Sequence, residues 1–362
     1  MKIRSLLAAL CAALILLPGA AAETDGDCIY TMLDADGNRI TMRAAQMFVG
    51  DEYISGDNQL YRIVSVDDAA RTATAERVGQ AQIDEQALAA FYALADEQAA
   101  EDGGKRLVCM YSTHSDESYT PDDGTYSLWE DAGIYDVGNA LKDELEARGI
   151  EVVYSEESFL PHDADAYNRS RATAEELLKQ GPDALLDIHR DAIPAEEYET
   201  TVDGEEISKV RLFVGRSNQN ADANRAFAQE IKAVADEEYP GLIKDIYIGK
   251  GNYNQELYPQ ALLLEFGTDE IEKDKAIGAT EYMAEVLDQV LYGESAQAET
   301  NADAAPAATG IFWVIGIAIV GAVIYGLAST GKLSGMWNKL KRGLSELTGG
   351  LAGKKPGDEE EK

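Results

Sequence analysis

Three apolar segments end in side chains that can bind zinc or move a proton. They cover residues 107–119, 184–191 and 261–267, and each begins with a run typical of a buried β-strand. A parallel sheet gathers the carboxyl ends of its strands into one crevice, so residues far apart in sequence can meet there. The side chains in question, in chain order, are His114, Glu117, His189, Arg190 and Glu265.

Two imidazoles and one carboxylate form a ligand set that leaves one zinc position open for water. We predict that His114, Glu117 and His189 bind Zn²⁺, and that Glu265 acts as the general base. The chain has only 3 histidines, and two of them belong to this set. A metallohydrolase is therefore the leading interpretation.

Each residue also has a simpler explanation. Acidic residues occupy 66 of 362 positions, so about 18% of histidines would have one three residues later by chance. His189 could be a hydrogen-bonded core histidine. Glu265 interrupts an apolar strand, where a carboxylate is costly unless it is paired or functional. Arg190 could pair with Asp191, and we interpret His162 as structural in preference to a ligand.

From residue 105 to 292, expected strands alternate with amphipathic helices, which is the pattern of an α/β domain with a mostly parallel sheet. Gly149 and Gly181 stand where two of the helices should end. The expected strands are 106–112, 151–155, 183–188, 209–214, 245–248 and 261–266. The expected helices are 131–148, 166–180, 218–238 and 271–292.

The rest of the chain divides by composition. On the N-terminal side we expect a signal peptide (1–22), a small β module (23–80) and a helical connector (81–104). On the C-terminal side we expect a linker (293–309), a transmembrane helix (310–330), and a cytoplasmic juxtamembrane segment with an acidic tail (331–362).

The membrane topology follows from charge. Residues 311–328 contain no charged side chain and are just long enough to cross a bilayer core. Acidic residues precede this stretch and Lys and Arg residues follow it, so the positive-inside rule predicts a cytoplasmic C-terminus. We therefore expect a single-pass protein of the cell membrane, anchored by its C-terminal helix, with its bulk outside the cytoplasm.

The net charge of −35 becomes −37 (−35 minus 2) when Lys2 and Arg4 leave with the signal peptide. Repulsion between like charges then argues against nucleic acid as a partner. Cys28 and Cys109 remain after processing. A disulfide between them is open, but a buried thiol is the favoured interpretation of Cys109, which lies in an expected central strand.

An ordered set of motifs resembles the stage II sporulation protein P family over residues 106–290. Family members often carry His-Thr-His in the first motif, where this chain has Ser112 in place of the first histidine. The expected C-terminal anchor also differs from the N-terminal anchor expected of the family. The motifs are Tyr111–Tyr119, His162-Asp163, Tyr167–Thr173, Asp187–Asp191, Val214-Gly215, Asn218, Asn224, Tyr239–Leu242, Tyr253–Gln255 and Leu263–Gly267.

The resemblance implies the fold of a zinc-dependent N-acetylmuramoyl-L-alanine amidase, with peptidoglycan as substrate. It also implies a second activity on peptide cross-links, a role in engulfment of the forespore, and other sporulation cell-wall hydrolases as partners. In the corresponding mechanism, Glu265 takes a proton from water activated by Zn²⁺ and passes it to the leaving amine, and Arg190 stabilises the oxyanion. Two alternatives remain: a zinc carboxypeptidase acting on stem peptides, and a non-catalytic peptidoglycan-binding scaffold.

Overall fold

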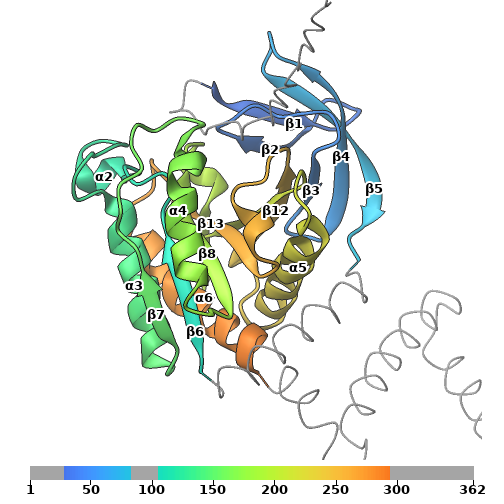
Figure 1. The fold of residues 1–362 in the computed structure, drawn as a ribbon. Coiled ribbons are helices and arrows are strands. Elements are labelled where there is room, and N and C mark those ends of the chain that lie inside the picture. Colours follow the sequence, from blue (N-terminus) through green and yellow to red (C-terminus); the bar gives the residue numbers. More distant parts are fainter. Residues whose placement is uncertain (1–27, 83–104, 294–362) are drawn as a thin grey trace, which may run out of the picture. The chain divides into compact units, whose positions relative to one another are not determined.

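The computed structural model describes residues 28–82 and 105–293 (Figure 1). The predicted signal peptide, nearly all of the connector, the linker, the transmembrane helix and the tail lie outside these residues. Within the two described ranges, no helix combines the length and apolarity needed to span a bilayer.

The described elements follow the expected alternation closely. The strands are β1 (Tyr30–Leu33), β2 (Arg39–Arg43), β3 (Glu52–Ile54), β4 (Gln59–Asp67), β5 (Thr72–Gln80), β6 (Leu107–Tyr111), β7 (Glu151–Tyr154), β8 (Ala184–Asp191), β9 (Glu199–Val202), β10 (Glu205–Ser208), β11 (Val210–Gly215), β12 (Ile243–Gly249) and β13 (Ala261–Thr268). The helices are α2 (Thr120–Asp123), α3 (Gly133–Ala147), α4 (Ala166–Leu178), α5 (Ala221–Glu238) and α6 (Lys273–Tyr292), with short 3-10 helices η2 (Ala195–Glu197) and η3 (Gln255–Leu257).

A mixed sheet of 11 strands organises the fold, in the order β2-β1-β5-β4-β3-β12-β11-β13-β8-β6-β7. The neighbours β13, β8, β6 and β7 are parallel, while β11 and β12 are parallel to each other and antiparallel to β13. The predicted mixed, mostly parallel sheet of the α/β region is confirmed. The three strands of the chemical segments, β6, β8 and β13, lie side by side and end at the same edge.

The N-terminal strands extend this sheet instead of forming a sheet of their own. Strand β3 pairs antiparallel with β12, with Ile54 opposite Ile246. This pairing satisfies the edge of β12, which would otherwise leave backbone groups open. The strands expected between residues 23 and 80 are therefore present, but they continue the sheet of the α/β region. The boundaries of that module stay a prediction.

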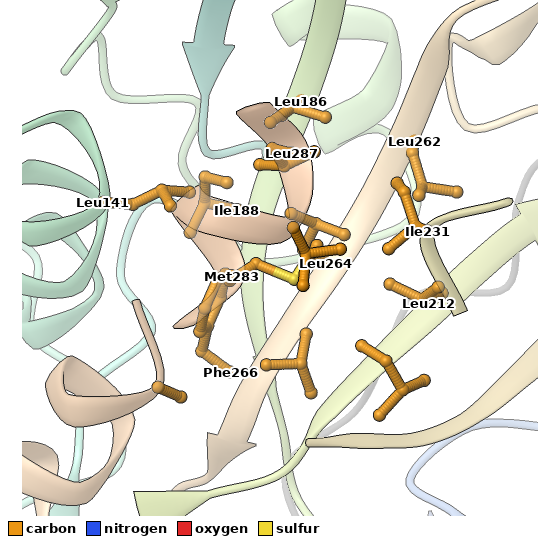
Figure 2. Close-up of a cluster of buried hydrophobic side chains, with 14 of the residues drawn as sticks. Leu141, Leu186, Ile188, Leu212, Ile231, Leu262, Leu264, Phe266, Met283 and Leu287 are labelled. Carbon is orange, nitrogen blue, oxygen red and sulfur yellow. The ribbon is translucent and has the colours of Figure 1, made fainter. Parts of the chain in front are cut away.

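The main core lies between one face of the sheet and helices α3, α5 and α6 (Figure 2). Alternate strand residues point into it, among them Ile188, Leu212 and Leu264, and Met283 and Leu287 of α6 pack against them. Helix α4 covers β6 and β8 on the opposite face, where Leu177 packs near Cys109. Both Cys28 and Cys109 are free thiols, and burial raises the pKa of Cys109 to about 12.

Helix α3 shows how the sequence sets these packing faces. Its buried residues Ile134, Val137, Leu141 and Leu145 recur at helical spacing and form one stripe. The helix ends as predicted at Gly149, whose φ of 78° is unfavourable for residues with a Cβ. The apolar stripe faces the sheet, so the strand ends that carry the chemical side chains are held by a close-packed core.

Candidate metal centre

The three predicted ligands meet at one point. A turn, closed by the Glu117 N–H donating to the His114 carbonyl oxygen at 3.2 Å, brings these two side chains together after β6. His114 Nδ1 lies 3.1 Å from Glu117 Oε1, and His189 Nδ1 lies 3.2 Å from the same oxygen. The three ligand atoms lie within 4.8 Å of one another, and all three residues are buried.

This set fits Zn²⁺. Ligand atoms about 2.0–2.1 Å from a tetrahedral zinc lie roughly 3.3 Å from one another. The separations of 3.1 and 3.2 Å agree with that value. His114 Nε2 is buried without a hydrogen-bond partner. The nitrogen of this ring that faces Glu117 is Nδ1. Two imidazoles with one carboxylate also match the donor types of catalytic zinc sites.

Asp187 holds His189 from behind. Its Oδ1 lies 2.9 Å from His189 Nε2, which leaves Nδ1 of the ring directed at Glu117. The same carboxylate accepts hydrogen bonds from the backbone N–H and hydroxyl of Thr113, at 2.8 and 2.7 Å. A carboxylate in this place fixes the orientation of a metal-binding imidazole and makes it a stronger donor.

The third histidine also lies at this site. The His162 ring stacks on His114 with centroids 3.9 Å apart, and its Nδ1 lies 3.0 Å from Asp116 Oδ1. Tyr167 closes another side, 5.4 Å from His114 between ring centroids. His162 is not in the group of three ligands. Its contacts agree with the structural interpretation, but they are made directly against a ligand.

Ser112, which replaces the first histidine of the family motif, takes no part in the ligand set. Its hydroxyl lies 2.9 Å from the hydroxyl of Tyr154. The substitution therefore leaves the three-residue site intact.

The pKa values of the two candidate histidine ligands are shifted in opposite directions by their surroundings. Burial, assisted by the positive charge of His162, lowers the pKa of His114 to about 4. Burial would also lower the pKa of His189, but the carboxylates of Asp187 and Glu117 raise it well above its ordinary value. Burial opposes ionisation of Glu117, yet His189 and His114 hold its pKa well below the usual range. Both directions favour an ion pair between Glu117 and His189, and a metal bound by His189 would compete with the proton of this ring.

Glu265 lies next to the ligands, in a row of polar residues that crosses four strands. It is in register with His189 on β8 and with Arg211 on β11, and Arg211 is in register with Asp245 on β12. Residues in register project from the same face of a sheet, so all four side chains share one face. A bulge follows Glu265, and Gly267 there has a φ of 75°. Bulges beside a site re-aim side chains.

Arg190 is placed differently from the expected oxyanion donor. Its guanidinium is buried, and it donates to the backbone carbonyl oxygens of Ser118, Tyr126 and Asp191 at 3.2, 2.7 and 3.4 Å. Its backbone N–H donates to Glu117 Oε2 at 2.9 Å. These bonds connect the loop that carries Glu117 to β8. In this geometry Arg190 stabilises the position of that loop.

Sequence reasoning did not select Asp187, Tyr198 or Arg211. Asp187 precedes His189 by two residues, and the period of a strand places both on one face. Arg211 interrupts an apolar strand, which is the same signal that identified Glu265. Tyr198 has no such signal, because its position follows from the path of the chain after β8.

The chain is similar to several known proteins. Two solved amidases are similar to the chain at 13% identity and a TM-score of 0.34. The N-acetylmuramyl-L-alanine amidase Ami1 from Mycobacterium smegmatis matches over 51% of this chain and 96% of its own length. The CwlD amidase from Clostridioides difficile matches over 54% of this chain and 100% of its own length. Resemblances at that level define no shared activity.

A curated relative is more similar. The stage II sporulation protein P of Bacillus subtilis (strain 168) is 28% identical over 206 residues, which is 52% of this chain and 51% of that protein. The chain therefore matches about half the length of this relative. The family model for Stage II sporulation protein P (SpoIIP) matches residues 36–288, well over half of the chain. This protein is a member of the stage II sporulation protein P family.

Proposed function

We propose that this protein is a zinc-dependent N-acetylmuramoyl-L-alanine amidase that cleaves peptidoglycan during sporulation. The observation that carries the proposal is the convergence of His114, Glu117 and His189, with Glu265 in register beside His189. Family membership supports the sporulation context and a cell-wall substrate.

The proposed roles follow from the positions of the side chains. The three ligands would hold Zn²⁺, which would acidify a water molecule and polarise the scissile carbonyl. Glu265 accepts the proton of the attacking water and returns it to the amine of L-alanine as the amide bond breaks. Asp187 keeps His189 oriented, and Arg190 keeps the loop of Glu117 in place.

We also propose that the protein is anchored in the cell membrane with this domain outside the cytoplasm. The uncharged residues 311–328 and the Lys and Arg residues that follow them support this topology.

Two substitutions test the roles of the carboxylates. Glu265→Gln keeps the size of the side chain but loses the proton acceptor, so peptidoglycan cleavage should fall by roughly 10² or more while zinc is retained. Glu117→Gln should instead weaken zinc binding, because a neutral amide replaces a charged ligand. Loss of zinc in the first variant with retention in the second would mean that the two roles are exchanged.

Analysis of the digestion products identifies the bond. An amidase frees intact stem peptides from the glycan, whereas a carboxypeptidase shortens stem peptides that stay attached. Zinc content of about one ion per chain with no product at all would support the scaffold alternative and refute catalysis.

A further inference from the structure

Glu265, the candidate general base, lies in a buried cluster of charged side chains. The other members of this cluster have no role in the mechanism above. Arg211 lies at its centre, fully buried, and donates through Nε to Asp245 Oδ1 at 2.7 Å and through Nη1 to Asp191 Oδ2 at 2.7 Å. Lys244 Nζ donates to Asp245 Oδ2 at 2.7 Å. Three carboxylates, counting Glu265, thus share two cations in a place that water does not reach.

Arg211 lies closer to Asp191 than to Glu265. Arg211 Nη1 lies 2.7 Å from Asp191 Oδ2 but 3.6 Å from Glu265 Oε2. Asp191 also accepts the N–H of Ala192 at 2.8 Å. Arg211 is therefore bonded directly to Asp191 and lies beside Glu265.

Tyr198 stands between these two carboxylates. Its hydroxyl lies 2.8 Å from Glu265 Oε2 and 3.0 Å from Asp191 Oδ2, and the ring is fully buried. A phenol has one hydrogen to donate, so the two contacts share it. The hydroxyl therefore links Glu265 to Asp191, which Arg211 holds in turn.

We propose that Tyr198 is a positioning residue for Glu265. Its hydroxyl donates to Glu265 Oε2 and holds the carboxylate in the orientation that the general base needs. Asp191, which Arg211 fixes, lies on the other side of the same hydroxyl and keeps it in place. No proton passes through Tyr198. The inference rests on the proposed function, because it assigns Glu265 the acid–base task.

Tyr198→Phe in the full-length, zinc-loaded protein tests this, with Tyr247→Phe as the matched control. Tyr247 is equally buried and its hydroxyl also donates to a carboxylate, Asp51 Oδ2 at 3.1 Å. The centroid of its ring lies 5.9 Å from the guanidinium carbon of Arg211, and this contact is kept in Tyr247→Phe, so the control removes only the hydroxyl. Both variants lose one buried phenol–carboxylate bond and should lose similar thermal stability. Only Tyr198→Phe should lower kcat, by about 10-fold or more, with KM and zinc content unchanged.

A double variant shows whether Tyr198 acts through Glu265. If it does, Tyr198→Phe should leave the residual activity of Glu265→Gln unchanged, because the carboxylate that it serves is already gone. Equal kcat values in Tyr198→Phe and Tyr247→Phe, or the same fold loss in both Glu265 backgrounds, would overturn the inference and leave the amidase proposal standing. An inactive unsubstituted protein would overturn both.

A second measurement does not depend on how well Tyr198→Phe folds. Incorporating 3-fluorotyrosine at position 198 keeps the ring and the hydroxyl and adds a ¹⁹F signal. That signal should shift when Glu265→Gln is introduced, because an amide then replaces the carboxylate that accepts from the hydroxyl. An unchanged signal would refute the contact on which the inference is built.

Discussion

Asp187→Asn should weaken zinc binding without touching a ligand. The carboxylate of Asp187 serves three groups: His189 Nε2 at 2.9 Å and the backbone N–H and hydroxyl of Thr113 at 2.8 and 2.7 Å. An asparagine can still accept the Thr113 N–H through its one carbonyl oxygen. It cannot give His189 the negative charge that orients the ring and strengthens Nδ1 as a donor.

Losing such a partner typically weakens metal affinity 10–100-fold, which corresponds to about 1.4–2.8 kcal/mol. Competition between the protein and a chelating indicator at fixed pH measures the zinc Kd directly. Peptidoglycan cleavage should recover when enough zinc is added to refill the site, because Glu265 is unchanged.

Asp183→Asn is the matched control. Asp183 is also buried, and its carboxylate accepts the N–H of Leu107 at 2.9 Å and the hydroxyl of Tyr292, at the opposite end of the same strands. It should cost stability but leave the zinc Kd within about twofold of the unsubstituted value. Equal losses of affinity in both variants would mean that general loosening of the sheet, and not the contact with His189, explains the result.

Three further predictions concern Arg190, Asp245 and the membrane. Arg190→Met leaves buried carbonyl oxygens without their donor, so it should lower the free energy of unfolding by roughly 1–3 kcal/mol; a loss of kcat at unchanged thermal stability would instead restore the oxyanion role. Burial opposes ionisation of Asp245, but Arg211 and Lys244 lower its pKa to about 2. The ionised carboxylate therefore stabilises the folded protein by about 2 kcal/mol at pH values above the unfolded pKa of about 4. This stabilisation is lost as the pH falls through about 2. The stability difference between the unsubstituted protein and Asp245→Asn, followed by thermal unfolding, should therefore narrow between pH 4 and 2; a constant difference would contradict this. Protease added to intact protoplasts should remove the domain and spare a small C-terminal fragment, whereas full protection of the domain would reverse the topology.

Local patterns were sufficient to predict most of the elements. Apolar runs of strand length, helical spacing of buried residues and Gly149 gave the alternation of strands and helices to within a few residues. The convergence of His114, Glu117 and His189 was predictable because they follow apolar runs, and the strands β6 and β8 that end beside them are parallel neighbours. The remaining step, that three strand ends meet, needed only the rule that parallel strands share an edge.

The parts that could not be predicted depend on pairing between distant strands. Nothing local to β3 indicates that it pairs with β12 across almost 200 residues. Likewise, the antiparallel insertion of β11 beside β13 sets Arg211 opposite Glu265, and a shift of one residue would have turned it to the other face. The contacts of Arg190 could not be predicted either, because the Ser118 and Tyr126 carbonyl oxygens that it binds belong to a loop whose path the sequence does not reveal.

Arg211 connects the N-terminal strands to the surroundings of Glu265. Its Nη2 donates to Thr41 Oγ1 at 3.1 Å and to the Met42 carbonyl oxygen at 3.0 Å, both on β2. With Asp245 and Asp191 on its other sides, the guanidinium is held as a fixed charge beside Glu265. Without β2, Arg211 would lose two acceptors and its cover from solvent, and the balance of charge around Glu265, the proposed general base, would change. The family match begins at residue 36 and so includes β2. That extent is expected if these strands complete the setting of Glu265, and not only the edge of the sheet.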